Sequence, residues 1–250
     1  MPPIEETLDW APAPDARFVT THWSVVLAAS DGASPAANEA LELLCRTYWQ
    51  PLYAFVRRRG YELHEAQDLT QEFFARLLTK NYLSDADRTK GKFRTFLLTA
   101  LEHFLANEWR DAHAQKRGGH VAFLSFDDPI AEEQLRQLSS GHVSPEQLYE
   151  KQWAMTLLEQ ALGALQRECA AAGKGAWFTE LKIFLTGEKR SVSYAELAGK
   201  LGSTEGALKT AVNRLRQRYA GLLREEVARI VASPGEVEEE LRALLAALSG

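Results

Sequence analysis

The chain has 250 residues, of which 46% are hydrophobic and 25% charged, and its formal net charge is −5. This composition is typical of a soluble globular protein of one large or two small domains, and the acidic balance argues against a non-specific nucleic-acid coat protein. The sequence contains no apolar run near the ~20 residues of a membrane span. Its two cysteines, Cys45 and Cys169, are far apart, so we expect buried thiols, a cytoplasmic location and no bound metal.

The first half of the chain is predicted to be helical after an N-terminal arm. Residues 1–20 are rich in Pro, Ala and acidic groups, which predicts disorder and neither a signal peptide nor an anchor. Apolar residues at helical spacing predict helices over 22–29, 38–59, 63–78 and 93–116. Pro51 predicts a kink or break, and Gly60 the end of the helix that contains it.

The second half is also predicted to be helical and contains no convincing strand. A Gly-, Ser- and Pro-containing segment predicts a linker over 118–145. Helices are predicted over 146–172, 177–185 and 236–248, and two short helices joined by a tight turn over 194–219. We therefore expect an all-α fold of two small helical domains joined by a flexible linker. The expected divisions are an arm over 1–20, a domain over 21–117, the linker, a domain over 146–226 and an acidic helical extension over 227–250.

Residues 194–219 predict a helix-turn-helix. Ala198 is small where two helices must cross, and Gly202 lies where the turn needs positive φ. Ser203 or Thr204 can cap the second helix. The apolar stripe expected on that helix consists of Ala207, Leu208, Ala211, Val212 and Leu215.

The opposite face of this second helix is polar and basic. Segment 205–224 holds five basic residues against one acid. On a DNA-binding helix we expect Arg214, Arg216 and Arg218 to contact phosphates. The base edges would be contacted by Lys209, Thr210 and Asn213, with Thr204 on the same face. The alternative is an ordinary solvated amphipathic helix with basic residues near its C-terminus.

A second basic segment, 88–117, holds seven basic residues against three acids. Aromatic residues are interleaved with the basic ones (Phe93, Phe96, Phe104 and Trp109). This mixture suits unstacked bases, although most of these aromatics must form the core stripe of their own helix.

These segments carry a resemblance to a known family. AQDLTQEFFARLLTKNYL followed by KFRTFLLTALEHFLANEWRD resembles the second conserved region of bacterial RNA polymerase sigma factors, closest to the two-domain extracytoplasmic-function type. The resemblance covers about 40–117 and 146–225, and the helix-turn-helix lies in the second segment.

The resemblance implies a division of roles. Asp68, Gln71 and Glu72 would contact the β′ clamp helices of core RNA polymerase, whose β flap is a further expected partner. The loop 84–91 and the helix after it would read and open the promoter −10 element, and the helix 204–218 would read the −35 element. The −10 contacts expected are Arg88, Lys90, Lys92, Arg94, His103, Asn107 and Arg110.

The resemblance also implies an anti-sigma factor or another regulator, a monomeric free protein and no cofactor. His103 and Asn107 stand where the family commonly has Asn and Asp, so they bear on which −10 base is favoured. The extension exceeds the minimal family pattern. Its Leu241, Leu244, Leu245 and Leu248 suggest a lid docked on the second domain, and a regulatory segment is the alternative.

Two other classes of protein fit part of the pattern. A free-standing helix-turn-helix repressor or activator, with an N-terminal ligand-sensing or dimerisation domain, would bind a palindrome without polymerase. An enzyme is disfavoured, because no phosphate-binding glycine loop, nucleophile elbow or zinc-helix histidine spacing occurs.

Overall fold

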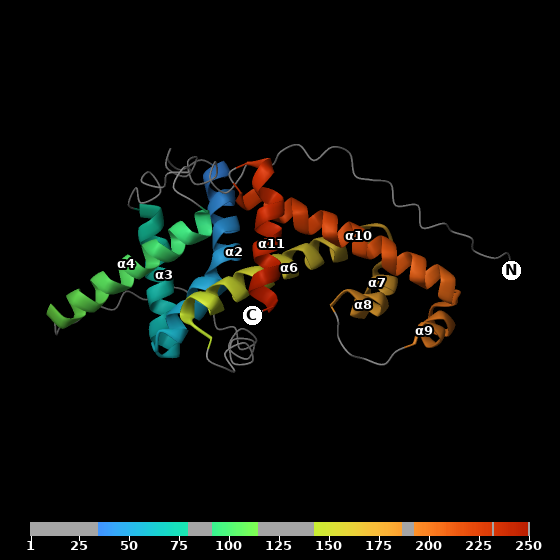
Figure 1. Cartoon of the computed structure of the whole chain (residues 1–250), viewed down its shortest axis with the longest axis horizontal. Coiled ribbons are helices and arrows are strands. Elements are labelled where there is room, and N and C mark those ends of the chain that lie inside the picture. The colour runs from blue at the N-terminus through green and yellow to red at the C-terminus, as the bar shows by residue number, and fades with distance from the viewer. Residues whose placement is uncertain (1–34, 80–91, 115–142, 187–192, 232, 250) are drawn as a thin grey trace. The chain divides into compact units, whose positions relative to one another are not determined.

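The computed structural model describes residues 35–79, 92–114, 143–186, 193–231 and 233–249, and within these ranges every regular element is a helix (Figure 1). The all-α expectation is therefore confirmed for the part of the chain described. The helices are α2 (Pro35–Arg58), α3 (Leu63–Thr79), α4 (Phe93–Ala114), α6 (Pro145–Ala171), α7 (Gly175–Leu181), α8 (Ile183–Thr186), α9 (Tyr194–Leu201), α10 (Glu205–Ile230), the 3-10 turn η2 (Pro234–Glu236) and α11 (Val237–Ser249).

The chain divides into two compact units. The N-terminal unit contains the described residues up to Leu157 together with those from Val227 onward, and the C-terminal unit contains Leu158–Glu226. Two helices, α6 and α10, therefore contribute to both units. The expected arm 1–20, the helix 22–29, the loop 84–91 and nearly all of the linker 118–145 lie outside the described residues.

The core of the N-terminal unit is built from aromatic residues of α2, α3 and α4. Tyr48 meets Phe93 edge to face at 5.5 Å between ring centroids, and Phe73 lies 5.8 Å from Phe104. Leu52 and its neighbours on α2 are almost fully buried. The helix continues through Pro51, so the break considered from the sequence does not occur. Burial on both sides of the proline offsets the ~3 kcal/mol that a proline costs inside a helix.

The C-terminal unit is organised around the α9–α10 pair. Ala198 packs with Leu208, Ala211 and Val212 in one buried cluster, as the small residue at the crossing predicts. Gly202 ends α9 at φ 60° and ψ 37°, the left-handed conformation expected for it. The Thr204 hydroxyl accepts a hydrogen bond from the Ala207 amide at 3.2 Å, so Thr204 caps α10.

The structure corrects several side-chain assignments. Ala207 is exposed and not part of the α10 stripe, because its position on the first turn faces away from α9. On α11, Leu244 is fully buried but Leu245 is 62% exposed. Glu240 is buried instead, and Cys45 is only half-buried.

The extension packs on a different partner from the one expected. We predicted a lid on the second domain, but α11 belongs to the N-terminal unit, with α2, α3 and α4. The reason is electrostatic as well as apolar, because Glu239 and Glu240 form ion pairs with Lys92 and Arg94 at the start of α4.

Candidate nucleic-acid and polymerase interface

The three residues predicted to bind polymerase lie on one helix, α3. Asp68 and Glu72 are exposed and one turn apart, and Gln71 between them is half-buried. Thr70 on the opposite side is fully buried and donates its hydroxyl to the Ala66 carbonyl at 2.7 Å. Burial of the Thr70 side thus turns the two carboxylates toward solvent, where a cationic surface of a partner can reach them.

An ion-pair chain ties this face to α4. Arg76 holds the Glu72 carboxylate at 2.7 Å and the Glu108 carboxylate, on α4, at 2.7 Å. The Arg76 guanidinium also lies 5.0 Å from the centre of the Phe104 ring. These contacts hold α3 and α4 in register. Arg76 and Glu108 lie 32 positions apart, and no local sequence pattern indicates that they pair.

The predicted −10 residues on α4 separate into two groups. His103, Asn107 and Arg110 are exposed, and Arg110 donates to the Asn107 side-chain carbonyl. His103 and Asn107 line a hollow of about 310 Å³ between α3 and α4, together with Phe73 and Phe96. An apolar hollow with an amide and an imidazole at its wall can accept a flat ring and hydrogen-bond its edge.

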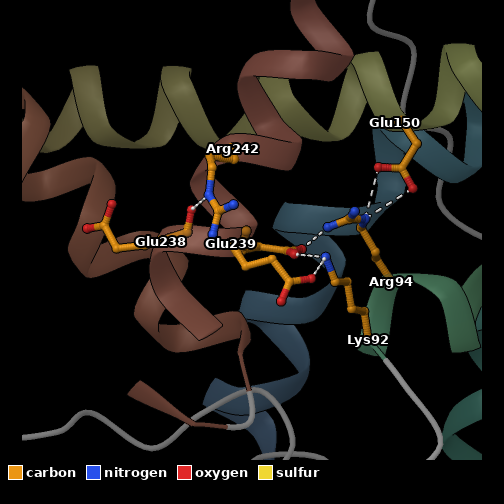
Figure 2. A network of polar contacts seen from close by, with 7 residues as sticks. Lys92, Arg94, Glu150, Glu238, Glu239 and Arg242 are labelled. Carbon is orange, nitrogen blue, oxygen red and sulfur yellow. Dashed lines mark hydrogen bonds and ion pairs between the residues drawn. The ribbon is translucent and has the colours of Figure 1, made fainter. Parts of the chain in front are cut away.

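The second group lies at the N-terminal end of α4 and is held by carboxylates (Figure 2). The Lys92 ammonium lies 3.1 Å from Glu239 and 2.8 Å from Glu240. Arg94 pairs with Glu240 and, through its Nε, with Glu150 on α6 at 2.9 Å. Arg88 and Lys90, the other two predicted −10 residues, lie outside the described residues.

Arg94 is embedded in its surroundings. Its guanidinium lies 4.3 Å from the centre of the fully buried Trp153 ring, and the Tyr149 hydroxyl donates to the Arg94 carbonyl at 2.9 Å. Only 9% of the Arg94 side chain is exposed, against 34% for Lys92. While Glu240 stays in place, Arg94 cannot reach a phosphate. Burial also raises the pKa of Tyr149 well above its usual range.

The predicted −35 residues lie along α10, and most are open to solvent. Those that are exposed are Thr204, Lys209, Thr210, Asn213, Arg214 and Arg216. Several of these side chains also have contacts within the unit; the Thr210 hydroxyl, for example, donates to the Gly206 carbonyl at 3.0 Å. Lys209 pairs with Glu205 at 3.5 Å, and Arg216 donates to the Phe184 carbonyl at 3.0 Å.

Arg218 differs from the rest of this set. It binds Glu168 through two nitrogens, at 2.9 and 2.6 Å, and Glu225 through a third contact at 2.9 Å. Its hydrogen bonds with Glu168 and then with Glu225 raise the pKa of its guanidinium, despite partial burial. With only 17% of its side chain exposed, Arg218 joins α6 to α10.

Neighbouring titratable groups are structural in character. The Tyr219 hydroxyl donates to the Leu158 carbonyl at 3.0 Å, and burial raises the pKa of Tyr219 to about 12. Burial likewise raises the pKa of the Cys45 and Cys169 thiols.

In the described segments, no three His, Cys, Asp or Glu residues gather as metal ligands would. None of the helices there combines the length and apolar character needed to cross a membrane.

The comparisons with known proteins bear on the N-terminal unit. Residues 44–115 match the family model of Sigma-70 region 2. No curated protein sequence matches the chain, and no solved structure does. The matched segment includes α3, with its exposed carboxylates, and the described part of α4, with its basic residues. This segment is therefore similar to sigma-70 region 2, the conserved region of sigma-70 family sigma factors that the family model describes.

Proposed function

We propose that the chain is a sigma factor of the extracytoplasmic-function type, which acts in the cytoplasm by directing core RNA polymerase to promoters and opening them. The observation that carries this proposal is the region 2 match over 44–115. It is supported by a second helical unit in which a capped helix, α10, carries exposed basic and amide side chains.

The polymerase contact is assigned to α3. Asp68 and Glu72 project from the exposed face of that helix, and Gln71 lies at its edge. Fixed carboxylates on a rigid helix steer a cationic partner and set the register of docking more than they add affinity. We assign the β′ clamp helices as that partner and the β flap as the partner of the C-terminal unit.

The DNA contacts are divided between the two units. In the C-terminal unit, α9 and α10 act as a helix-turn-helix, in which Arg214 and Arg216 bind phosphates while Lys209, Thr210 and Asn213 face base edges. In the N-terminal unit, the hollow beside His103 and Asn107 receives a base from the melted −10 strand. Arg218, held by Glu168 and Glu225, orients α10 for its contacts.

The test of this proposal is run-off transcription with purified bacterial core polymerase, on DNA taken from upstream of the chain's own gene. A discrete transcript should form only when both proteins are present. Failure to co-elute with core enzyme, or to start any transcript, overturns the proposal. Tight binding to a palindromic operator by the free dimeric chain would instead indicate a free-standing repressor.

A charge-removing variant on α3 makes the polymerase assignment specific. Glu72→Gln should weaken binding to core polymerase about tenfold, because it removes an exposed carboxylate and releases Arg76, which then pairs with Glu108 alone. Binding of the C-terminal unit to DNA should not change. Glu159→Gln, which removes an exposed carboxylate on α6, is the matched control. Normal core binding by Glu72→Gln would exclude α3 as the docking helix.

A further inference from the structure

The acidic helix α11 covers two cations of the region 2 segment. Glu239 and Glu240 lie on the first turn of α11 and form ion pairs with Lys92 and Arg94. Lys92 lies just before α4, and Arg94 lies on its first turn. Figure 2 shows Glu239 and Lys92 approaching each other, with Arg94 close by and bound to Glu150. The two helices are separated by more than a hundred residues in the sequence, so the contact is tertiary.

Burial distinguishes this contact from ordinary surface ion pairs. Only 5% of the Glu240 side chain and 9% of the Arg94 side chain are exposed. Leu244, one turn further along α11, is fully buried and anchors the same helix. A buried carboxylate is stable only beside its cations, so α11 depends on Lys92 and Arg94 for its position.

We propose that α11 is an intramolecular competitor of nucleic acid, in which Glu239 and Glu240 occupy the places of two backbone phosphates at the start of α4. DNA reaches Lys92 and the Glu240-facing edge of Arg94 only when α11 moves away. This inference rests on the proposed function, because it concerns the regulation of the same −10 surface.

The cations themselves support phosphate as the displaced ligand. Lys92 presents one ammonium to two carboxylate oxygens, and Arg94 keeps Glu150 and Trp153 on its other sides whether or not α11 is present. Removal of α11 therefore leaves the Arg94 guanidinium held in place by Glu150, with the edge that contacted Glu240 no longer paired with a carboxylate. Two adjacent, oriented cations at the first turn of a helix favour phosphate oxygens.

The test compares three variants of the full chain with the unmodified protein. The affinity for a labelled single-stranded oligonucleotide of mixed sequence is measured by anisotropy, without polymerase, at several salt concentrations. The combined Glu239→Gln and Glu240→Gln variant, and a chain ending at Ser233, should each bind at least tenfold more tightly. The salt dependence should steepen by about 1.4 in log–log slope, because each of the two added phosphate contacts contributes about 0.7 on single strands.

Glu238→Gln is the matched control. It removes one negative charge, half of what the double variant removes, from an exposed position of α11, and Figure 2 shows its carboxylate directed away from Lys92 and Arg94. Its oligonucleotide affinity should stay within about twofold of that of the unmodified chain. A gain as large as that of the double variant would mean that net charge is responsible, and would overturn the proposal. Unchanged affinity in the double variant would also overturn it.

A second measurement uses the unmodified chain, so it does not depend on how the variants fold. Amide hydrogen exchange across α11 should become faster when the oligonucleotide is added in excess, while exchange across α4 becomes slower. Protection of both helices would show that DNA binds with α11 in place, which contradicts the proposal. Neither measurement involves polymerase. If the chain supports transcription but the variants bind the oligonucleotide no more tightly than the unmodified chain, this inference fails and the proposed function stands.

Discussion

Arginine side chains in this protein serve two different purposes, and burial separates them. Arg94 and Arg218 are mostly buried and bind carboxylates from other helices, whereas Arg214 and Arg216 are exposed on α10. All four occur in basic stretches of the sequence, where their roles look alike. An arginine locked between carboxylates stabilises the fold, and an exposed one remains available to a phosphate.

The buried position of Arg94 leads to a stability prediction. Arg94→Gln should lower the free energy of unfolding by about 3 kcal/mol, because it leaves Glu240 buried beside a single cation and removes the contact with Trp153. Chemical denaturation measures this change. Lys92→Gln, at a more exposed site, should cost less than about 1 kcal/mol. Equal losses in the two variants would contradict the structural role of Arg94.

Arg218 and Arg214 should respond in opposite ways to the same substitution. Arg218→Gln removes three charge-assisted contacts to Glu168 and Glu225 and should cost about 2 kcal/mol of stability. Arg214→Gln, at an exposed site, should lower the melting temperature less than Arg218→Gln does and should weaken binding to −35 duplex DNA. Arg167→Gln, at an exposed site on α6, is the control for loss of one positive charge. If Arg218→Gln leaves the stability unchanged, the structural role of Arg218 is contradicted and a phosphate contact becomes its expected role again.

At the scale of the element, the α9–α10 pair is defined by local chemistry at its ends. Ser193 accepts a hydrogen bond from the Glu196 amide at 3.2 Å, and the Glu196 carboxylate accepts one from the Ser193 amide at 2.9 Å. The bond from the Ser193 amide, and then one from the Ser193 hydroxyl to the same carboxylate at 3.1 Å, lower the pKa of Glu196. The reciprocal pair fixes where α9 begins, just as Gly202 fixes where it ends.

Two glycines of this pair should have opposite effects when replaced by alanine. At Gly202, where φ is 60°, alanine should destabilise the C-terminal unit by about 1 kcal/mol from backbone strain alone, since a Cβ there would meet no atom within 4 Å. At Gly199, inside α9, alanine would also meet open space and should stabilise the unit by up to about 1 kcal/mol. Thermal unfolding of both variants gives the comparison, and a loss of stability at both sites would contradict it.

Helix positions could be predicted from the sequence because they depend on local spacing and caps. The helix predicted over 63–78 is observed over 63–79, and the extension helix predicted over 236–248 is observed over 237–249. Contacts between residues far apart in the sequence could not be predicted from local spacing and caps. The leucine stripe of α11 predicted that Leu245 docks, but Leu245 is exposed. The buried residue is Glu240, whose partners Lys92 and Arg94 are far away in the sequence and have no local signature beside it.

The candidate site was predictable in part for the same reason. The α3 carboxylates and the polar face of α10 follow from helical periodicity, and the structure leaves most of them exposed. The pairing of Arg218 with Glu168 involves residues 50 positions apart and has no local signature. Basic composition alone therefore does not distinguish Arg218, which is paired with carboxylates, from the exposed arginines of α10.

At the scale of the whole molecule, the proposed function places two modest DNA contacts on one chain. When both are held on polymerase, the second contact becomes intramolecular, with an effective concentration that can reach millimolar. The holoenzyme should therefore bind promoter DNA on the order of a hundredfold more tightly than the free chain, as anisotropy with a labelled promoter fragment can measure. Comparable affinity for the free chain would contradict this view.

The N-terminal unit is discontinuous in the sequence, since it takes its described residues from the segment before Leu158 and from the segment after Glu226. During synthesis, α11 leaves the ribosome after every other described helix. A nascent chain therefore carries α2, α3 and α4 for the whole time needed to translate the C-terminal unit before Glu240 can meet Arg94. Until α11 follows, Lys92 and Arg94 lack the carboxylates of Glu239 and Glu240, so the order of synthesis leaves these two cations uncovered while the C-terminal unit is being made.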